Sequence, residues 1–495
     1  MSKKKKNRSA IKDHKHINKT LVAPMNTLPV PLNFTSWGEE RLCEMLWAAL
    51  VLVRLSRNEA TRAFGAVVSL GEKYRELDKK RLGNKFDLSV TGMSVNSESI
   101  LEDAVAALRD FSPDNHILRP LLLLDCLPEK ARWQAAINET PADSDWQLMG
   151  EAIGRCLNHQ SQEATDIRFV TVAFETALGL VCLPQNDEAR QIADEFAAYP
   201  YLPEETLRRV RPTIRSFESA VRTRKYCKTK FTDEYWPEVF KKTHCAMIVG
   251  EETATSSSIA PQQFEKLRAL VAQHYVDTLV GPAVDPKLDT IFGATLYGIR
   301  CLRELCETTS IRYGVAGKAL LRALLEIRIN LAYLVKSDAD DLWVKYRRYG
   351  ASQAKLALLK LDLVEGSLPT SLSEDTLESI ANEDIYQEFI DIPLGSWSGE
   401  DLRKLSEKSG TKDDYDKFYG WASTFVHSHW CAMRDSEFTT CMNPLHRLHR
   451  VPRAKSRQLE DPLPDSVHLM NEIFKTLESQ YPGISPRFSI ETQAV

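Results

Sequence analysis

The chain has 495 residues, of which 43% are hydrophobic and 27% are charged. Because this length exceeds what one hydrophobic core can serve, we expect two or three domains. The composition is that of a globular protein and excludes a wholly disordered chain. A formal net charge of -4 argues against a surface built throughout to hold nucleic acid, although local basic patches stay open.

The cysteines and the apolar runs indicate the compartment. Ten cysteines are spread along the chain without any Cys-x-x-Cys pair, which is typical of free thiols in a reducing environment. The basic start is not followed by an apolar segment, so no secretory signal is predicted. The longest apolar run, residues 45–53, is far shorter than the ~20 residues that cross a bilayer. We therefore expect a cytoplasmic protein without a membrane span.

Residues 1–36 are predicted to form a disordered basic tail. Lysines occupy positions 3–6, and Pro24, Pro29 and Pro31 follow. Repulsion between like charges and the restricted backbone of proline keep such a stretch extended and solvated. The tail either only aids solubility or steers the chain towards an anionic partner, and the sequence leaves both open.

Residues 37–250 are predicted to be a helical domain, a set of helical hairpins or a bundle. Apolar residues recur every three or four positions from Leu42 onwards, as in amphipathic helices. Further helices are expected near 59–80, 98–111, 129–139, 145–158, 162–182, 186–198, 204–223 and 232–247. Residues 144–147 match a capping-box pattern, and the β-leaning stretch 86–95 is expected to be a loop or a short hairpin.

The polar segment 251–262 is the predicted linker to a second helical domain at 262–480, which we expect to be a bundle. Helices are expected there near 262–280, 287–309, 315–336, 340–363, 373–390, 400–408, 413–434 and 466–479. The sequence therefore predicts an all-α protein of two helical domains behind a basic tail.

The helix expected at 315–336 carries a polar stripe on an otherwise apolar surface. Arg322, Glu326 and Asn330 follow one another at four-residue steps and so share a face. Burying charges is costly unless they are paired, and an Arg322–Glu326 pair would supply part of the compensation. The stripe is either an internal ion pair that fixes the register of the helix or the wall of a polar pocket.

The helix expected at 413–434 places Ser423 and His427 on one face and aromatic residues on another. One interpretation of His427 is a core histidine whose two nitrogens both find partners. The other is a general acid or base, or a phosphate contact.

These two helices carry a resemblance to a known family. Arg322-x-x-x-Glu326-x-x-x-Asn330, a helix with Tyr346 and Tyr349, and Ser423-x-x-x-His427 together resemble the bacterial family catalogued as domain of unknown function 5677. The resemblance spans residues 285–435. It implies an all-helical domain of bacterial proteins, several of them suspected of defence against phage.

A looser similarity is to the HEPN ribonucleases. These are helical bundles whose active site is an arginine, four to six residues, and then a histidine. The positions four to seven before His427 hold Ser423, Ala422, Trp421 and Gly420, so Arg322 would have to supply the cation from another helix.

Two further clusters of side chains are weighed as sites. Cys441, His446 and His449 have loose metal-ligand spacing, but only three donors occur among several arginines, so neither a metal nor a cofactor is predicted. A basic stretch of the first domain is the better nucleic-acid candidate, with a solvated helix face as its alternative. Its members are Arg208, Arg211, Arg215, Arg222, Arg224, Lys225 and Lys228.

Two functions remain open. The first is a helical interaction or effector protein of bacterial anti-phage defence or stress, which binds a co-encoded protein or nucleic acid, with a homo-oligomer left open. The second is a ribonuclease or nucleotide-processing enzyme. In it Arg322 would stabilise phosphate charge and Glu326 would orient that arginine. Asn330 would bind substrate and His427 would transfer the proton, supported by Ser423.

Overall fold

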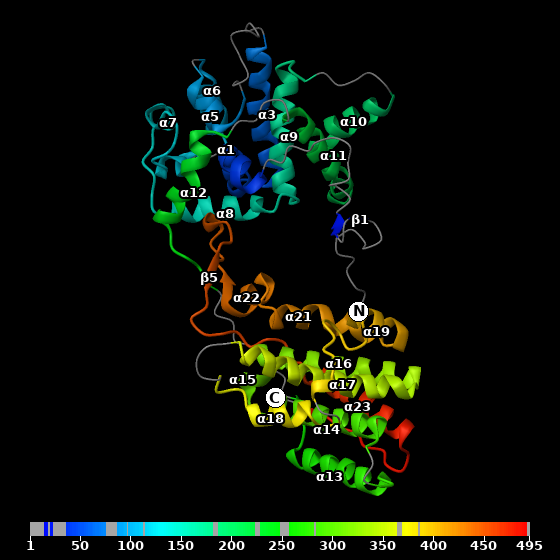
Figure 1. Ribbon diagram of the computed structural model, residues 1–495. Helices are drawn as coiled ribbons and strands as arrows, with labels where there is room; N and C mark the ends of the chain where they lie inside the picture. The colour runs from blue at the N-terminus through cyan, green and yellow to red at the C-terminus, as the bar shows by residue number, and fades with distance from the viewer. Residues whose placement is uncertain are drawn as a thin grey trace. The chain divides into compact units, whose positions relative to one another are not determined.

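The chain divides into two compact units (Figure 1). The N-terminal unit comprises Met1–Ile248 and Thr440–Arg450, and the C-terminal unit comprises Val249–Thr439 and Val451–Val495. The computed structural model describes residues 14–17, 20–22, 36–75, 87–96, 98–111, 114–181, 187–222, 228–247, 257–281, 284–363, 369–384 and 387–492. About 69% of the chain is helical, which confirms the all-α prediction.

The N-terminal unit has one large apolar core and a smaller one to which α9, α10, α11 and η6 contribute. Helix α2 is buried from Leu46 to Leu52 and packs against α3, α8 and α9, as expected of a helix that is apolar on every side. The elements in chain order are η3 (Trp37–Arg41), α1 (Leu42–Glu44), α2 (Leu46–Arg54), α3 (Arg57–Tyr74), α5 (Val90–Val95), α6 (Ile100–Arg109), η5 (Arg119–Leu123), α7 (Lys130–Ile137), α8 (Asp145–Leu157), α9 (Gln162–Ala177), α10 (Asp187–Ala198), η6 (Tyr199–Tyr201), α11 (Glu204–Arg222) and α12 (Lys230–Lys242).

Two local predictions for this unit are wrong. The stretch 86–95 was expected to be a loop or hairpin, but Val90–Val95 form helix α5. Ser89 caps this helix, because its side chain accepts a hydrogen bond from the N–H of Gly92 at 2.8 Å. At the predicted capping box, Ser144 does precede α8, yet its side chain makes no capping bond because its backbone is already helical.

Most of the predicted basic tail lies outside the described residues. Within it, β1 (Lys15–Ile17) and β2 (Thr20–Val22) pair as a short antiparallel hairpin. This part of the tail therefore has regular structure, which the charge pattern alone did not indicate.

The C-terminal unit is organised around α16 (Val315–Ser337), which packs against α14, α19, α21 and α23 (Figure 1). Leu324, Leu325 and Ile329 of α16 are completely buried there. The other elements are β3 (Ser257–Ser258), α13 (Pro261–Thr278), α14 (Pro286–Glu307), α15 (Thr309–Arg312), α17 (Asp340–Leu361), α18 (Glu374–Ala381), η7 (Gln387–Phe389), α19 (Leu402–Ser409), α20 (Lys412–Asp414), η8 (Tyr415–Tyr419), α21 (Gly420–Val426), α22 (Trp430–Glu437), α23 (Leu463–Gln480) and β6 (Glu491–Thr492), which pairs with β3.

One segment departs from the predicted continuous domain at 262–480. The chain leaves the C-terminal unit at Thr440, contributes Thr440–Arg450 to the N-terminal unit and then returns. Strands β4 (Phe438–Thr440) and β5 (Arg450–Pro452) pair where it leaves and returns, and η9 (Pro444–His446) lies between them. Within the N-terminal unit η9 packs on α8, where a Cβ atom at Gly154 would lie 3.0 Å from Pro444. We refer to Thr440–Arg450 as the excursion.

None of the described helices is both long enough and apolar enough to cross a membrane.

Candidate functional site

The polar stripe of α16 lies at the surface of the C-terminal unit. Nε of Arg322 donates a hydrogen bond to Oε1 of Glu326 at 2.9 Å, and the two side chains are 17% and 40% exposed. The guanidinium carbon also stands over the ring of Tyr419, 5.2 Å from its centroid. An ion pair and a cation–π contact therefore fix the arginine in one orientation.

His427 ends α21, and Arg322 reaches it. Nη1 of Arg322 lies 3.3 Å from Nε2 of His427. Because a guanidinium only donates hydrogen bonds, Nε2 accepts, and the proton of the neutral ring is on Nδ1. Arg322, Glu326 and His427 thus converge, while the half-buried Ser423 lies one helical turn before the histidine.

Asn330 belongs to a neighbouring aromatic cluster and not to this convergence. Its Oδ1 accepts a hydrogen bond from Nε1 of Trp397 at 3.1 Å. Tyr346 packs edge-on against the same indole, with 5.0 Å between the ring centroids. Burial raises the pKa of Tyr346, and the Glu326 carboxylate raises it further, so this phenol stays protonated.

The predicted single helix over 413–434 is wrong, because the chain breaks between α21 and α22. Ser428 has a left-handed backbone with φ of 51°. The N–H of His429 reaches the carbonyl of Thr424 at 2.9 Å, and the N–H of Ser428 reaches that of Phe425 at 3.4 Å. This is a Schellman motif, which usually has glycine at the left-handed position. With serine there, the sequence contained no stop signal.

The segment on both sides of the break exposes aromatic and histidine rings, which sequence reasoning missed. The rings of His427 and His429 stack with centroids 6.0 Å apart. Trp421 and Trp430, on the same segment, are 47% and 59% exposed. Tryptophan combines a large apolar ring with a polar N–H group and is enriched at binding interfaces.

The helices that carry these residues lie in a part of the chain that matches a protein family. Residues 290–440 match the model of a family of unknown function, DUF5677. The match confirms the resemblance predicted from the two helices, and it contains Arg322, Glu326, Asn330, Ser423 and His427. We refer to residues 290–440 as the DUF5677 region. No curated protein and no solved structure is similar enough to match the chain, and the looser similarity to HEPN ribonucleases is not shown.

The basic stretch outside the DUF5677 region does not form one fully exposed face among the described residues. Arg208 is exposed, but Arg211 and Arg215, on the same side of α11, are half-buried. Burial lowers the pKa of Arg215, and the neighbouring Arg211 lowers it further. Lys228 pairs with Asp233 at 2.5 Å. The side chains of Arg222, Arg224 and Lys225 lie outside the described residues, so nucleic-acid binding here stays a prediction.

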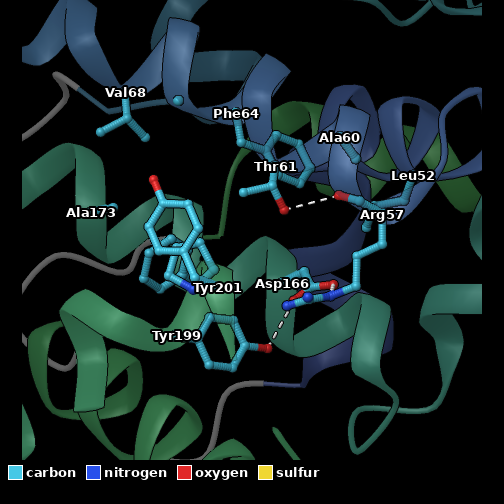
Figure 2. A pocket seen from close by; sticks show the side chains of 13 residues that line it. Leu52, Arg57, Ala60, Thr61, Phe64, Val68, Asp166, Ala173, Tyr199 and Tyr201 are labelled. Carbon is cyan, nitrogen blue, oxygen red and sulfur yellow. Dashed lines mark hydrogen bonds and ion pairs between the residues drawn. The ribbon is translucent and has the colours of Figure 1, made fainter. Parts of the chain in front are cut away.

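A pocket of about 180 Å³ lies in the N-terminal unit between α3, α9 and η6 (Figure 2). Its walls are mostly apolar, and a polar cluster closes one side. There Asp166 accepts hydrogen bonds from the Tyr199 hydroxyl at 2.8 Å and from Nε of Arg57 at 3.3 Å. Burial raises the pKa of Asp166, and the Arg57 charge opposes this. These contacts serve the packing of the unit, and we assign the pocket no ligand.

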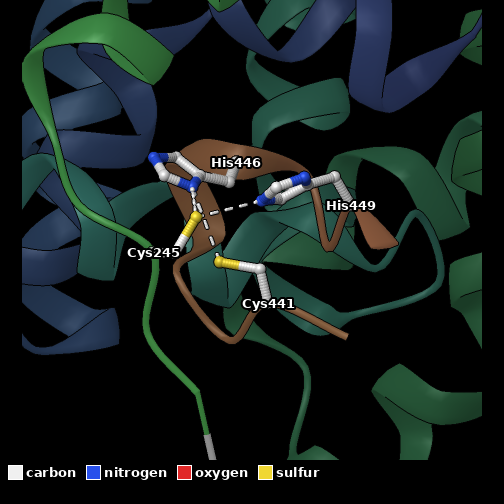
Figure 3. Close-up of side chains that lie close together, drawn as sticks. All are labelled: Cys245, Cys441, His446 and His449. Atoms are coloured by element: carbon white, nitrogen blue, oxygen red, sulfur yellow. Dashed lines mark hydrogen bonds between the residues drawn. The ribbon is translucent and has the colours of Figure 1, made fainter. Parts of the chain in front are cut away.

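Four metal-ligating side chains meet elsewhere in the N-terminal unit (Figure 3). Cys245 lies beside Cys441, His446 and His449, and the four ligand atoms are all within 4.8 Å of one another. The inference that this set lacks a fourth donor is therefore wrong. Sequence reasoning missed Cys245 because it is 201 positions away from His446. Arg447, whose charge argued against a metal, is paired with Glu39.

Proposed function

We propose that the DUF5677 region cleaves single-stranded RNA, with Arg322 holding a phosphate and His427 moving a proton. The observation that carries the proposal is the 3.3 Å approach of the arginine to Nε2 of the histidine. Glu326 holds the guanidinium from its other side, so the remaining N–H groups have fixed directions. Phosphoryl transfer needs such a cation and a proton acceptor within reach of one reacting group.

The proposed reaction is an attack of the ribose 2′-hydroxyl on the adjacent phosphorus. Nε2 of His427 exchanges its contact with Arg322 for the hydroxyl and takes the proton, while Arg322 bonds the non-bridging phosphate oxygens. The O2′–P bond forms and the P–O5′ bond breaks. His429, in its protonated form, supplies the proton that O5′ needs. The products are a 2′,3′-cyclic phosphate and a 5′-hydroxyl.

The exposed aromatic rings support single-stranded RNA as the substrate class. Trp421 and Trp430 offer faces on which unpaired bases stack, a sequence-tolerant mode of binding. The required 2′-hydroxyl distinguishes RNA from DNA. Such an activity suits a cytoplasmic effector of bacterial defence or stress that a co-encoded protein, or self-association, holds in check. A protein that binds RNA without cutting it is the competing hypothesis.

The test is cleavage of end-labelled single-stranded RNA by the full chain, with the matching DNA as control substrate. We expect cleavage of RNA alone, with cyclic phosphate ends. The change His427→Gln should slow cleavage by about 10²–10⁴-fold. The change Arg322→Ala should slow it by about 10²–10³-fold.

Matched controls come from the same unit. Arg300 and His468 are exposed and lie outside the convergence, so Arg300→Ala and His468→Gln should cleave as the wild type does. Expression in a bacterium adds a second readout, in which both site variants should abolish growth arrest. RNA binding without cleavage, or equal cleavage by site and control variants, would contradict the enzyme proposal.

A further inference from the structure

We propose that Cys245, Cys441, His446 and His449 form a structural zinc site in the N-terminal unit (Figure 3). Two thiols and two imidazoles are the ligand set that zinc takes in closed structural sites. Oxygen ligands, which calcium and magnesium require, are absent from the set. The site shares no residue with the proposed RNA site, so either proposal can fail without the other.

The distances within the cluster fit a tetrahedral ion. With Zn–S of about 2.3 Å and Zn–N of about 2.0 Å, sulfur and nitrogen ligands of one zinc are about 3.5 Å apart. Cys245 Sγ lies 3.5 Å from Nδ1 of His446 and 3.4 Å from Nε2 of His449. Cys441 Sγ also lies 3.5 Å from Nδ1 of His446. These three sulfur–nitrogen distances match the separation expected around one zinc ion.

The surroundings of His446 leave its Nδ1 lone pair available. The Thr243 hydroxyl donates to the carbonyl of Val239 at 2.7 Å, so it accepts at its other side from Nε2–H of His446, 3.0 Å away. A hydrogen bond from the distal nitrogen is how proteins orient a metal-bound imidazole. Phe240 covers the rings of both histidines, with centroids 4.7 and 5.2 Å away.

The position of the donors indicates a structural role. Cys245 follows α12, whereas the other three donors come from the excursion, so one ion ties two distant segments of the N-terminal unit together. Between the histidines, Arg447 and Leu448 both have left-handed backbones, with φ of 52° and 53°. Residues other than glycine hold this conformation only where their surroundings enforce it. A bound zinc would enforce it, and would leave no ligand position open for a substrate.

The experiment begins with the metal content of the full chain purified without chelators. We expect one zinc per chain by mass spectrometry of the elements. X-ray absorption should show two sulfur ligands at about 2.3 Å and two nitrogen ligands at about 2.0 Å. Cobalt in place of zinc should give thiolate charge-transfer bands and the visible bands of a tetrahedral ion.

Variants separate the site from general misfolding. Cys245 is exposed, so Cys245→Ser should leave the circular dichroism unchanged while zinc affinity falls by more than about a hundredfold, because even an outer-shell contact is worth up to that much. His449→Gln should do the same. Cys126→Ser and His244→Gln, in the same unit but outside the cluster, should keep the zinc. Purified chain without zinc that also fails to bind added zinc, or a Cys245→Ser chain that retains it like the controls, would overturn the proposal.

Discussion

Each unit presents a pair of histidines close in sequence, and the two pairs have different neighbours. His446 and His449 of the N-terminal unit face the sulfur atoms of cysteines. His427 of the C-terminal unit faces the guanidinium of Arg322, with His429 stacked beside it. Thiolates attract a divalent cation, whereas a fixed guanidinium repels one and attracts phosphate. We therefore propose metal binding for the histidine pair of the N-terminal unit and proton transfer for the pair of the C-terminal unit.

A third histidine, His116, has neither a cysteine sulfur nor a guanidinium among its hydrogen-bond partners in the part of the chain that the structure describes. It is 2% exposed, its Nδ1 accepts from the N–H of Leu118 at 3.1 Å, and its Nε2 faces the carbonyl of Val105 at 3.0 Å. Both nitrogens are occupied by the backbone, so the ring has a packing role alone. The comparison teaches that the partners of a histidine, more than its burial, determine its chemistry.

The largest expected difference between the two units is in their stabilisation by zinc. A ligand at a thousand times its Kd stabilises the folded state by about 4 kcal/mol, and here only the N-terminal unit holds the proposed site. Hydrogen exchange read by mass spectrometry should show that zinc, added back to the chain after a chelator has removed it, protects peptides from 440–450 and leaves those from 420–437 unchanged. Equal protection of both sets would remove the contrast between the two histidine pairs.

The change Arg322→Lys should give the next largest effect. Lysine keeps the positive charge but cannot bond Glu326 and His427 at once, as the fork of the arginine does. We expect kcat for RNA cleavage to fall by about 10–100-fold, a loss of roughly 1.4–2.7 kcal/mol, with little change in KM. Steady-state kinetics on one RNA measures both constants. Unchanged kcat would mean that charge alone, without the bonded geometry, accounts for the role of Arg322.

Local features of the sequence predicted much of this site. The helix expected at 315–336 is observed as Val315–Ser337, because its apolar period is continuous. Once that helix exists, its geometry places Arg322 and Glu326 on one face, and their hydrogen bond follows. The convergence with His427 required the packing of α21 on α16, which one sequence does not encode in any short motif.

The features that escaped prediction depend on long-range contacts or on an unusual residue. Ser428 adopts a backbone that glycine normally supplies, so the helix break and the exposure of His429 carried no signal. Cys245 joins the excursion only through folding, because nothing in its neighbourhood has metal-ligand spacing. The chain has ten cysteines, and no local signal singles out Cys245 among them as the fourth donor.

Acid should destabilise the N-terminal unit through His116, by less than the effects expected for zinc and for Arg322→Lys. Burial lowers the pKa of His116 in the folded unit. In the unfolded chain the pKa of this histidine is about 6.5. As the pH falls below that value, the unfolded chain takes up a proton that the folded unit does not, so this stability is complete above the unfolded pKa and is lost below it. The expected slope is at most about 1.4 kcal/mol per pH unit.

Urea unfolding of the N-terminal unit at pH values between neutral and mildly acidic measures this slope. His116→Gln cannot take up the proton, so its free energy of unfolding should depend less on pH than that of the wild type. Parallel curves for the two proteins would show that other groups cause the acid sensitivity.

The smallest effect is expected from a change of Arg208, and it tests whether the N-terminal unit also contacts RNA. Arg208 is exposed, but its neighbours Arg211 and Arg215 are half-buried, so these three arginines do not present one exposed charged face to a phosphate backbone. The loss of one phosphate contact changes the slope of log K against log salt by about 0.7 for a single strand. We expect Arg208→Ala to change this slope by less than that amount, and the neighbouring Arg209→Ala should also change it by less.

The loss of a stacking ring should have a larger effect. Stacking is worth about 1–3 kcal/mol per base, so Trp430→Ala should weaken RNA binding more than either arginine variant. The reverse order would move the RNA surface to α11 and leave His427 without a substrate.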